Sequence, residues 1–234
     1  MSAAVTLGRQ DDVAVITIDD GKANALSPEV IAAINGHLDD IEAAGSTFRA
    51  VVLSGREGMF SGGFDLKVMR GGDADAMMAL VTSGGDLVGR LFRSPRPVVC
   101  ACTGHAIAAG ALLLLGSHLR IGAAGDFRIG LIETAIGMVL PDWAVVMADE
   151  RLSRAQIQRA VVEARVYGPE DALGAGFLDH IVAPGDVIGV AVAEAARMGA
   201  LDANAYAGNS VKLRSPAVAR FDAAIAGDRK EALR

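Results

Sequence analysis

The chain has 234 residues, of which 52% are hydrophobic and 21% charged, as suits one globular domain with an aliphatic core. Its formal net charge is −6 and its lysines and arginines are scattered, which argues against binding to nucleic acid or an anionic membrane. The first residues lack a basic segment followed by an apolar stretch, and the longest apolar run, of 11 residues, is too short to span a bilayer. We therefore expect a cytoplasmic protein without a secretory signal.

The first third of the chain predicts a hairpin, a helix and a buried strand. Residues 4–19 alternate apolar and polar side chains on both sides of a polar turn, as in two short paired strands. Residues 27–45 begin with Ser27 as a helix N-cap and Pro28 at the first helical position. Residues 48–55 are an apolar run that ends at a glycine, which is typical of a buried strand.

The alternation of helices and strands then repeats. Residues 73–94 predict a helix that Gly84 and Gly85 interrupt. The segments that follow are predicted as strands at 96–104, 119–124 and 126–131 and as helices at 110–118, 141–152 and 154–166. Helices that recur between strands indicate an α/β fold.

From about Asp186 onward the pattern is helical only, with predicted helices at 185–200, 204–215 and 216–234. We therefore expect residues 1–185 to form the α/β core and residues 186–234 to form a C-terminal helical region. No low-complexity linker separates the two, so the helices are expected to pack on the core or on a neighbouring subunit.

Two segments place small residues where a strand gives way to the next element. Gly62 and Gly63 follow one predicted strand, and Ala108, Ala109 and Gly110 lead from another strand into a helix. The spacings of a P-loop and of a dinucleotide-binding fingerprint are missing. Ser61 has Met59 where a nucleophile elbow has its first glycine, so it is interpreted as a turn residue. Free backbone N–H groups at such places can hold a negative charge. Two facing segments would form an oxyanion hole, whereas a turn without a ligand is the alternative.

Four segments together resemble a known family. "KANAL" (22–26), "FSGGFDLK" (60–67), "GHAIAAGALLLL" (104–115) and "IGLIETAIGMVLP" (129–141) are similar, in order and spacing, to motifs of the crotonase superfamily of enoyl-CoA hydratases and isomerases. The resemblance covers roughly residues 5–190. It implies a crotonase-like superhelix of strand–strand–helix (ββα) units and a C-terminal helical trimerisation region, with a homotrimer or a hexamer made of two trimers as the assembly. It also implies an acyl-CoA thioester as substrate, so that coenzyme A is part of the substrate and no separate cofactor is expected.

The same resemblance implies roles for individual residues. The N–H groups of Phe64 and Ala109 would form the oxyanion hole, and Glu133 would be the catalytic acid–base group, in an apolar pocket that raises its pKa. A solvated loop charge is the alternative for Glu133. The methyl group of Ala109, where the family usually has glycine, requires an ordinary negative φ. The residues expected to contact the substrate are Lys22, Ala23, Gly62, Gly63, Asp65, Lys67, Gly110 and Leu112.

Leu112 bears on the reaction type. Hydratases of the family carry a second glutamate at this place, and hydration commonly uses two carboxylates, whereas moving a double bond from position 3 to position 2 needs one base. The motifs therefore favour the isomerase branch, with 2-enoyl-CoA hydration as the alternative. A non-catalytic acyl-CoA-binding trimer and a thioester hydrolase are further alternatives.

The histidines and cysteines do not suggest a metal site. The four histidines are spread along the chain, and Cys100 and Cys102 lack a second pair of ligands at zinc spacing. We expect the two cysteines to be small buried residues.

Overall fold

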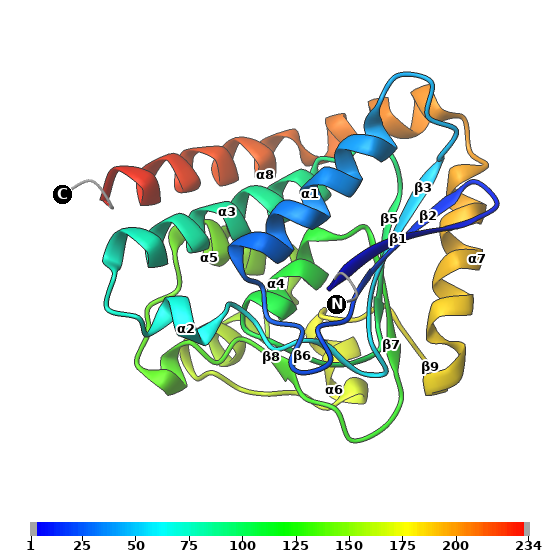
Figure 1. Cartoon of the computed structure of the whole chain (residues 1–234). Coiled ribbons are helices and arrows are strands. Elements are labelled where there is room, and N and C mark those ends of the chain that lie inside the picture. Colours follow the sequence, from blue (N-terminus) through cyan, green and yellow to red (C-terminus); the bar gives the residue numbers. More distant parts are fainter. Residues whose placement is uncertain (1–3, 232–234) are drawn as a thin grey trace.

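The structure is a computed structural model that describes residues 4–231, and it is built from a repeated strand–strand–helix unit (Figure 1). In each later unit the first strand joins a larger sheet and the second strand joins a smaller one. The units are β1 (Val5–Gln10), β2 (Val13–Ile18) and α1 (Pro28–Glu42); β3 (Ala50–Gly55), β4 (Gly58–Ser61) and α3 (Ala74–Phe92); β5 (Val98–Cys102), β6 (Gly104–Ile107) and α4 (Ala109–Gly116); and β7 (Leu119–Ala123), β8 (Ile129–Gly130) and α5 (Asp142–Arg151). The predicted α/β class with a ββα core is confirmed.

The two sheets differ in size, and the strands within each are mainly parallel. The larger sheet has the order β1-β2-β3-β5-β7-β9, where β9 is His180–Val182, and only its β1–β2 pair is antiparallel. The smaller sheet has the order β4-β6-β8 and is parallel throughout. The carboxyl ends of its three strands therefore meet at one edge.

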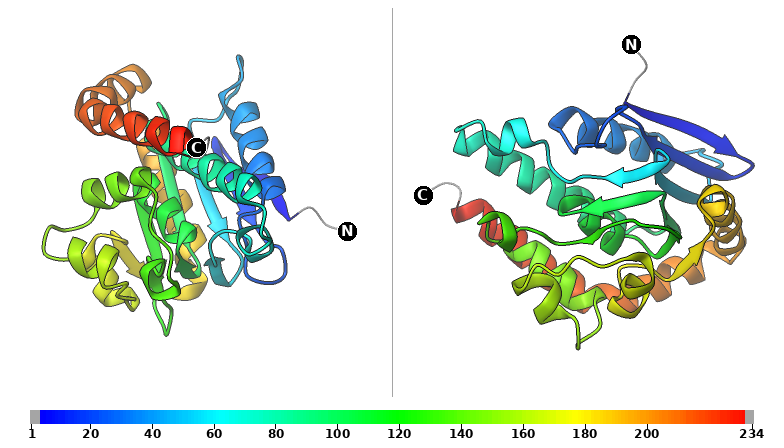
Figure 2. Two further views of the ribbon diagram at one scale, coloured as in Figure 1. Left: turned by 90° about the vertical axis from the view of Figure 1, so that its left-hand side faces the viewer. Right: turned by 90° about the horizontal axis from the view of Figure 1, so that it is seen from below.

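The C-terminal helices pack on the core of their own chain. The helix α7 (Val187–Gly199) covers the face of the larger sheet opposite α1 and α3 (Figure 1), where Val187, Ala191 and Ala195 are buried. The helix α8 (Ala203–Glu231) runs across α3 and α5 (Figure 2). The predicted boundary at 185/186 falls just before α7, and residues 1–3 and 232–234 of the two predicted regions lie outside the described residues.

The remaining elements are short. They are the helices α2 (Leu66–Met69) and α6 (Pro169–Ala175), 3₁₀ turns at Thr134–Ile136 and Pro184–Asp186, and a π-helical turn at Gln158–Val162. The predicted helix at 154–166 is thus reduced to one π-helical turn, and the strand predicted at 126–131 is reduced to Ile129–Gly130. The helix α3 is continuous through Gly84 and Gly85, so the predicted interruption was wrong.

Candidate active site

The segments singled out in the sequence meet at the carboxyl edge of the smaller sheet. Directly after β4 come residues 62–64, after β6 come residues 108–109, and after β8 come residues 131–133. Ligands of open α/β sheets bind outside the carboxyl ends of parallel strands. The fold therefore brings Phe64, Ala109 and Glu133 to one edge although 69 residues of chain (133 − 64) separate the first from the last.

The amide of Phe64 is held by an isolated parallel bridge to Leu26. The Leu26 N–H donates to the Gly63 carbonyl oxygen at 2.8 Å, and the Asp65 N–H donates to the Leu26 carbonyl oxygen at 3.1 Å. In a parallel bridge of this register the amide between these two points away from the partner. Among the hydrogen bonds of residues 4–231, none has the Phe64 N–H as donor.

The amide of Ala109 is free for a different reason. Ala109 is the first residue of α4, where an N–H has no acceptor within the helix. The preceding Ala108 N–H donates to the Gly130 carbonyl oxygen at 2.9 Å and so ties this segment to β8. No described residue accepts a hydrogen bond from the Ala109 N–H.

Backbone strain lies at Ala108 rather than at Ala109. Ala108 has φ 53° and ψ −124°, a conformation that glycine adopts readily and that costs other residues about 1–3 kcal/mol. Ala109 is helical and is absent from the positive-φ residues, as the sequence required.

The two amides come together at Gly63. Gly63 has φ 97°, and a Cβ built on it would lie 3.0 Å from the Ile107 carbonyl oxygen and 3.4 Å from the Ala109 amide nitrogen. Since Phe64 is the next residue, its amide and that of Ala109 flank the same small gap. Gly63 therefore permits close approach of the two segments, in addition to leaving the amides uncovered.

The other glycines of the site differ in role. A Cβ on the exposed Gly62 would lie 3.2 Å from the Ala23 carbonyl oxygen, which already accepts the Gly62 N–H at 2.8 Å. A Cβ on the buried Gly110 would overlap the Ser61 carbonyl oxygen. Gly110 thus lets α4 pack directly on β4, and its predicted contact with substrate stays a prediction.

A buried polar clamp, defined here as Asn24 and Ser61, supports the first amide. Asn24 is fully buried with φ 51°, and its Nδ2 donates to the carbonyl oxygens of Ile18 at 2.8 Å and Met59 at 2.9 Å. The Ser61 Oγ donates to the Asn24 carbonyl oxygen at 2.8 Å and accepts the Gly63 N–H at 3.2 Å. Ser61 therefore lies in a strand and is not the turn residue expected from the sequence.

Asn24 was not predicted as a site residue, although the sequence carries a signal for it. Asparagine tolerates positive φ better than most residues, and this one lies inside the first motif. The nearby Asp20 shapes the same loop: burial opposes its charge, but the N–H groups of Asn24, Lys22 and Ala25 outweigh burial and lower the pKa of Asp20.

Glu133 is half-buried just after β8, and one of its two carboxylate oxygens is shielded from solvent. Burial raises the pKa of Glu133, with only partial opposition from the backbone N–H groups of Glu133 and Ile132. Its Oε2 is buried and has no hydrogen-bond partner among the described residues. Such an oxygen is a free acceptor, and an acid with raised pKa is suited to take and return a proton near neutral pH.

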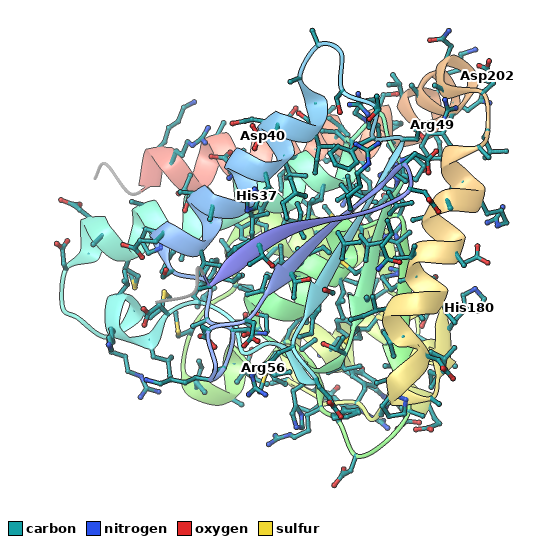
Figure 3. All side chains as sticks on the ribbon, turned by 45° about the vertical axis from the view of Figure 1, so that its right-hand side comes forward. His37, Asp40, Arg49, Arg56, His180 and Asp202 are labelled. Carbon is teal, nitrogen blue, oxygen red and sulfur yellow. The ribbon has the colours of Figure 1, made fainter. Side chains whose placement is uncertain are left out.

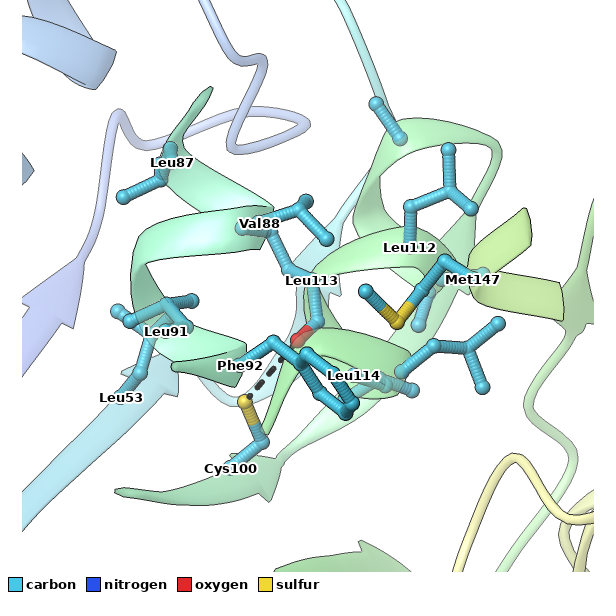
Figure 4. Packing of buried hydrophobic residues seen from close by; sticks show 14 of the residues in the cluster. Leu53, Leu87, Val88, Leu91, Phe92, Cys100, Leu112, Leu113, Leu114 and Met147 are labelled. Carbon is cyan, nitrogen blue, oxygen red and sulfur yellow. Dashed lines mark hydrogen bonds between the residues drawn. The ribbon is translucent and has the colours of Figure 1, made fainter. Parts of the chain in front are cut away.

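Leu112, where the family resemblance implies a second glutamate in hydratases, is a buried apolar side chain. It is 1% exposed on α4, whose eight residues are all buried. Figure 4 shows Leu112 beside Met147 of α5, on the side of α4 away from Cys100. Cys100 and Cys102 are buried free thiols, as expected.

The remaining predicted contact residues lie in the loop before α1 and at the start of α2. Lys22 and Lys67 are exposed, and the Asp65 carboxylate caps α2 by accepting the Lys67 N–H at 2.8 Å. Arg56, labelled in Figure 3, donates from Nε to the Lys22 carbonyl oxygen at 2.9 Å and so fixes this loop. Contact of Lys22, Ala23, Asp65 and Lys67 with a coenzyme stays a prediction.

Two cavities lie away from this edge, and neither is lined by a predicted site residue. One, of about 130 Å³, lies between the end of α3 and α8. The other, of about 410 Å³, includes Arg49, which Figure 3 shows near Asp202 at the α7–α8 turn. Within residues 4–231, no three His, Cys, Asp or Glu side chains gather as metal ligands would, and no helix is both long and apolar enough to cross a membrane.

Comparisons with known proteins identify the family of this chain. The family model of enoyl-CoA hydratase/isomerase matches residues 8–228. The probable enoyl-CoA hydratase EchA17 of Mycobacterium avium is 31% identical over 207 residues, which cover 84% of this chain and 76% of the relative.

Solved structures are similar over nearly the whole chain. The probable enoyl-CoA hydratase EchA3 of Mycobacterium tuberculosis has a TM-score of 0.93 and 38% identity, with 98% of this chain and 96% of that chain covered. A second structure of the same protein describes it as an enoyl-CoA isomerase. Human mitochondrial delta3-delta2-enoyl-CoA isomerase has a TM-score of 0.90 and 26% identity, with 98% and 92% covered. The chain therefore belongs to the enoyl-CoA hydratase/isomerase family and is an enzyme of that family.

Proposed function

We propose that this protein converts 3-enoyl-CoA thioesters to 2-enoyl-CoA thioesters, with Glu133 as the proton shuttle. The observation that carries the proposal is that Glu133 offers one half-buried carboxyl group, whose buried Oε2 has no hydrogen-bond partner among the described residues, while the side chain at Leu112 is apolar. One base is sufficient for isomerisation, and the reaction needs no bound water.

The proposed mechanism uses backbone and side chain in turn. The N–H groups of Phe64 and Ala109 hold the thioester oxygen, and each stabilises its developing negative charge by roughly 3–4 kcal/mol. The Glu133 carboxylate removes a proton from C2, which gives a dienolate. The protonated Glu133 then returns the proton to C4, and the double bond lies between C2 and C3 in the product.

Enoyl-CoA hydration is the second candidate, and the names of several relatives favour it. In that reaction Glu133 would activate a water that adds to C3, and a second group would have to assist. The oxyanion hole would serve both reactions. The two candidates therefore differ in whether a second group assists Glu133.

The test offers the purified protein 3-hexenoyl-CoA and crotonyl-CoA separately and follows both by NMR. We expect the 3-enoyl thioester to be isomerised much faster than crotonyl-CoA is hydrated. Faster hydration would make hydratase the correct assignment, and turnover of neither would leave a non-catalytic binder.

A substitution tests the role of position 112. Leu112→Glu should raise the ratio of hydration to isomerisation, because it supplies the second carboxylate. Leu113→Glu is the matched control, since Leu113 is the next residue of the same helix and is equally buried. If both variants change the ratio alike, position 112 has no special place in the site.

We also propose that the substrate's phosphates contact Lys22 and Lys67 and that the chain assembles as a trimer or hexamer through its C-terminal helices. Val211 and Leu213 on α8 support the assembly, since they are 63% and 78% exposed in the single chain and are apolar. Sedimentation analysis that finds only monomer would contradict it.

A further inference from the structure

We propose that Gly84 in α3 is a positioning residue for the oxyanion hole and that it acts through the ring of Phe64. A Cβ built on Gly84 would overlap Phe64 Cε1 and would lie 2.5 Å from Phe64 Cζ. Gly84 is buried, and the Phe64 ring packs against the hydrophobic core at this point. The residue that supplies the first amide is therefore anchored in a notch that only glycine leaves open.

A glycine inside α3 costs helix stability, so its presence at position 84 needs a reason in packing. Glycine weakens a helix interior relative to alanine, yet α3 stays helical from Ala74 to Phe92. The neighbouring Gly85 forms a second notch, in which a Cβ would lie 2.9 Å from Trp143 Nε1 and 3.0 Å from Ile225 Cδ1. The two glycines thus allow the rings of Phe64 and Trp143 to pack directly against the backbone of α3.

The ring position is coupled to the amide position. The backbone at Phe64 is fixed on one side by the Leu26 bridge and on another by the contact of Gly63 with Ile107. The ring in the Gly84 notch supplies a further constraint on how the Phe64 peptide is turned. Oxyanion donors must lie within about 2.7–3.1 Å of the charged oxygen, so a ring pushed outward would turn this donor out of range.

The test is Gly84→Ala, measured with the 3-enoyl and 2-enoyl thioesters. Alanine favours the helix, so the variant should fold, while its methyl group displaces the Phe64 ring. We expect kcat to fall by about tenfold to a hundredfold with KM changed little, because the donor acts mainly in the transition state. The matched control is Gly36→Ala in α1, where a Cβ would meet nothing within 4 Å; its kcat should equal that of the wild type.

A second substitution separates positioning from general damage. Phe64→Leu keeps the backbone N–H and shortens the side chain, so adding it to Gly84→Ala should restore kcat by about tenfold. Unchanged kcat in Gly84→Ala, or no recovery in the double variant, would overturn the proposal. If Gly84→Ala does not fold, Phe64→Ala serves instead: it empties the notch and should lower kcat, and wild-type kcat would contradict the proposal.

The inference rests on the proposed oxyanion hole but not on the choice between isomerase and hydratase. If the wild type turns over neither thioester, the proposed function fails separately. The carbonyl stretching frequency of a bound thioester then measures how strongly the two N–H groups bond its oxygen. This frequency should be lower in wild type than in Gly84→Ala, and equal frequencies would refute the positioning role.

Discussion

Glu133 shows at the scale of one residue how a site can oppose stability. Because burial raises the pKa of its carboxyl group, the folded chain binds a proton more tightly than the unfolded chain does. The stabilising contribution of the protonated form is complete below the unfolded pKa. It is lost as pH rises through the raised, folded pKa.

Replacement of Glu133 by glutamine should therefore stabilise the protein at neutral pH. Glutamine cannot ionise, so the gain should grow by about 1.4 kcal/mol for each unit by which the folded pKa is raised. Urea unfolding at several pH values measures it. A variant that is no more stable than wild type at neutral pH would show that the carboxylate is not buried in solution.

Part of the site could be predicted at this scale and part could not. Phe64, Ala109 and Glu133 lie inside motifs, and the fold brings these three to one sheet edge. Asn24 and Ser61 were missed because their function is to hydrogen-bond backbone groups 35 and 37 residues away along the chain. Such pairings follow from the fold, and the local signal is limited to the tolerance of Asn24 for positive φ.

At the scale of elements, the short strand β4 determines where the first amide lies. Ser61 ends this strand, and its hydroxyl links the Asn24 carbonyl oxygen to the Gly63 N–H. The strand was not predicted, because four residues before a glycine pair give little alternation. Its parallel pairing with β6 is what forms it.

Replacement of Ser61 by alanine should lower kcat by about tenfold, because the Gly63–Phe64 backbone loses a constraint on the proposed oxyanion donor. Ser54→Ala is the control. Ser54 is also fully buried, and its hydroxyl group is hydrogen-bonded to that of Thr17 in the larger sheet, with 3.1 Å between the oxygens. Each variant should lose roughly 1 kcal/mol of stability. Equal kcat in the two variants would contradict the role of the clamp.

Other elements depart from prediction for identifiable reasons. The helix α3 runs through Gly84 and Gly85 because aromatic rings packed on the glycines compensate for their weak helix propensity. The helix α8 runs through Pro216, where two helices were predicted. Pro216 is exposed, so water can bond the carbonyl group that the missing N–H leaves free.

For the whole molecule, the long helix α8 is joined to the core near the end of α4. His118, which follows α4, has Nε2 2.5 Å from Arg214 Nη1 and Nδ1 2.7 Å from Tyr206 Oη. Burial, together with the charges of Arg214 and Arg151, lowers the pKa of His118 from 6.5 to about 3. Sequence could not reveal this junction, since 88 and 96 residues separate the partners.

Acidification should therefore lower the free energy of unfolding of the protein. Below pH 6.5 His118 becomes protonated in the unfolded chain, but in the folded chain it stays neutral down to about pH 3. The free energy of unfolding therefore decreases as the pH falls through this range. Unfolding free energy should drop more between neutral pH and about pH 5 in wild type than in His118→Gln. The single tryptophan, Trp143, reports it by fluorescence because its ring lies 6.0 Å from Phe221 of α8. Equal losses in the two proteins would refute the assignment.

The central claim is that one carboxyl group moves the proton while two amides hold the thioester oxygen. The most direct measurement compares wild type and Glu133→Gln for turnover of 3-hexenoyl-CoA and for binding of its saturated analogue. We expect turnover to fall by several orders of magnitude in Glu133→Gln, while the dissociation constant changes by no more than a few fold. Substantial turnover by the glutamine variant would contradict it.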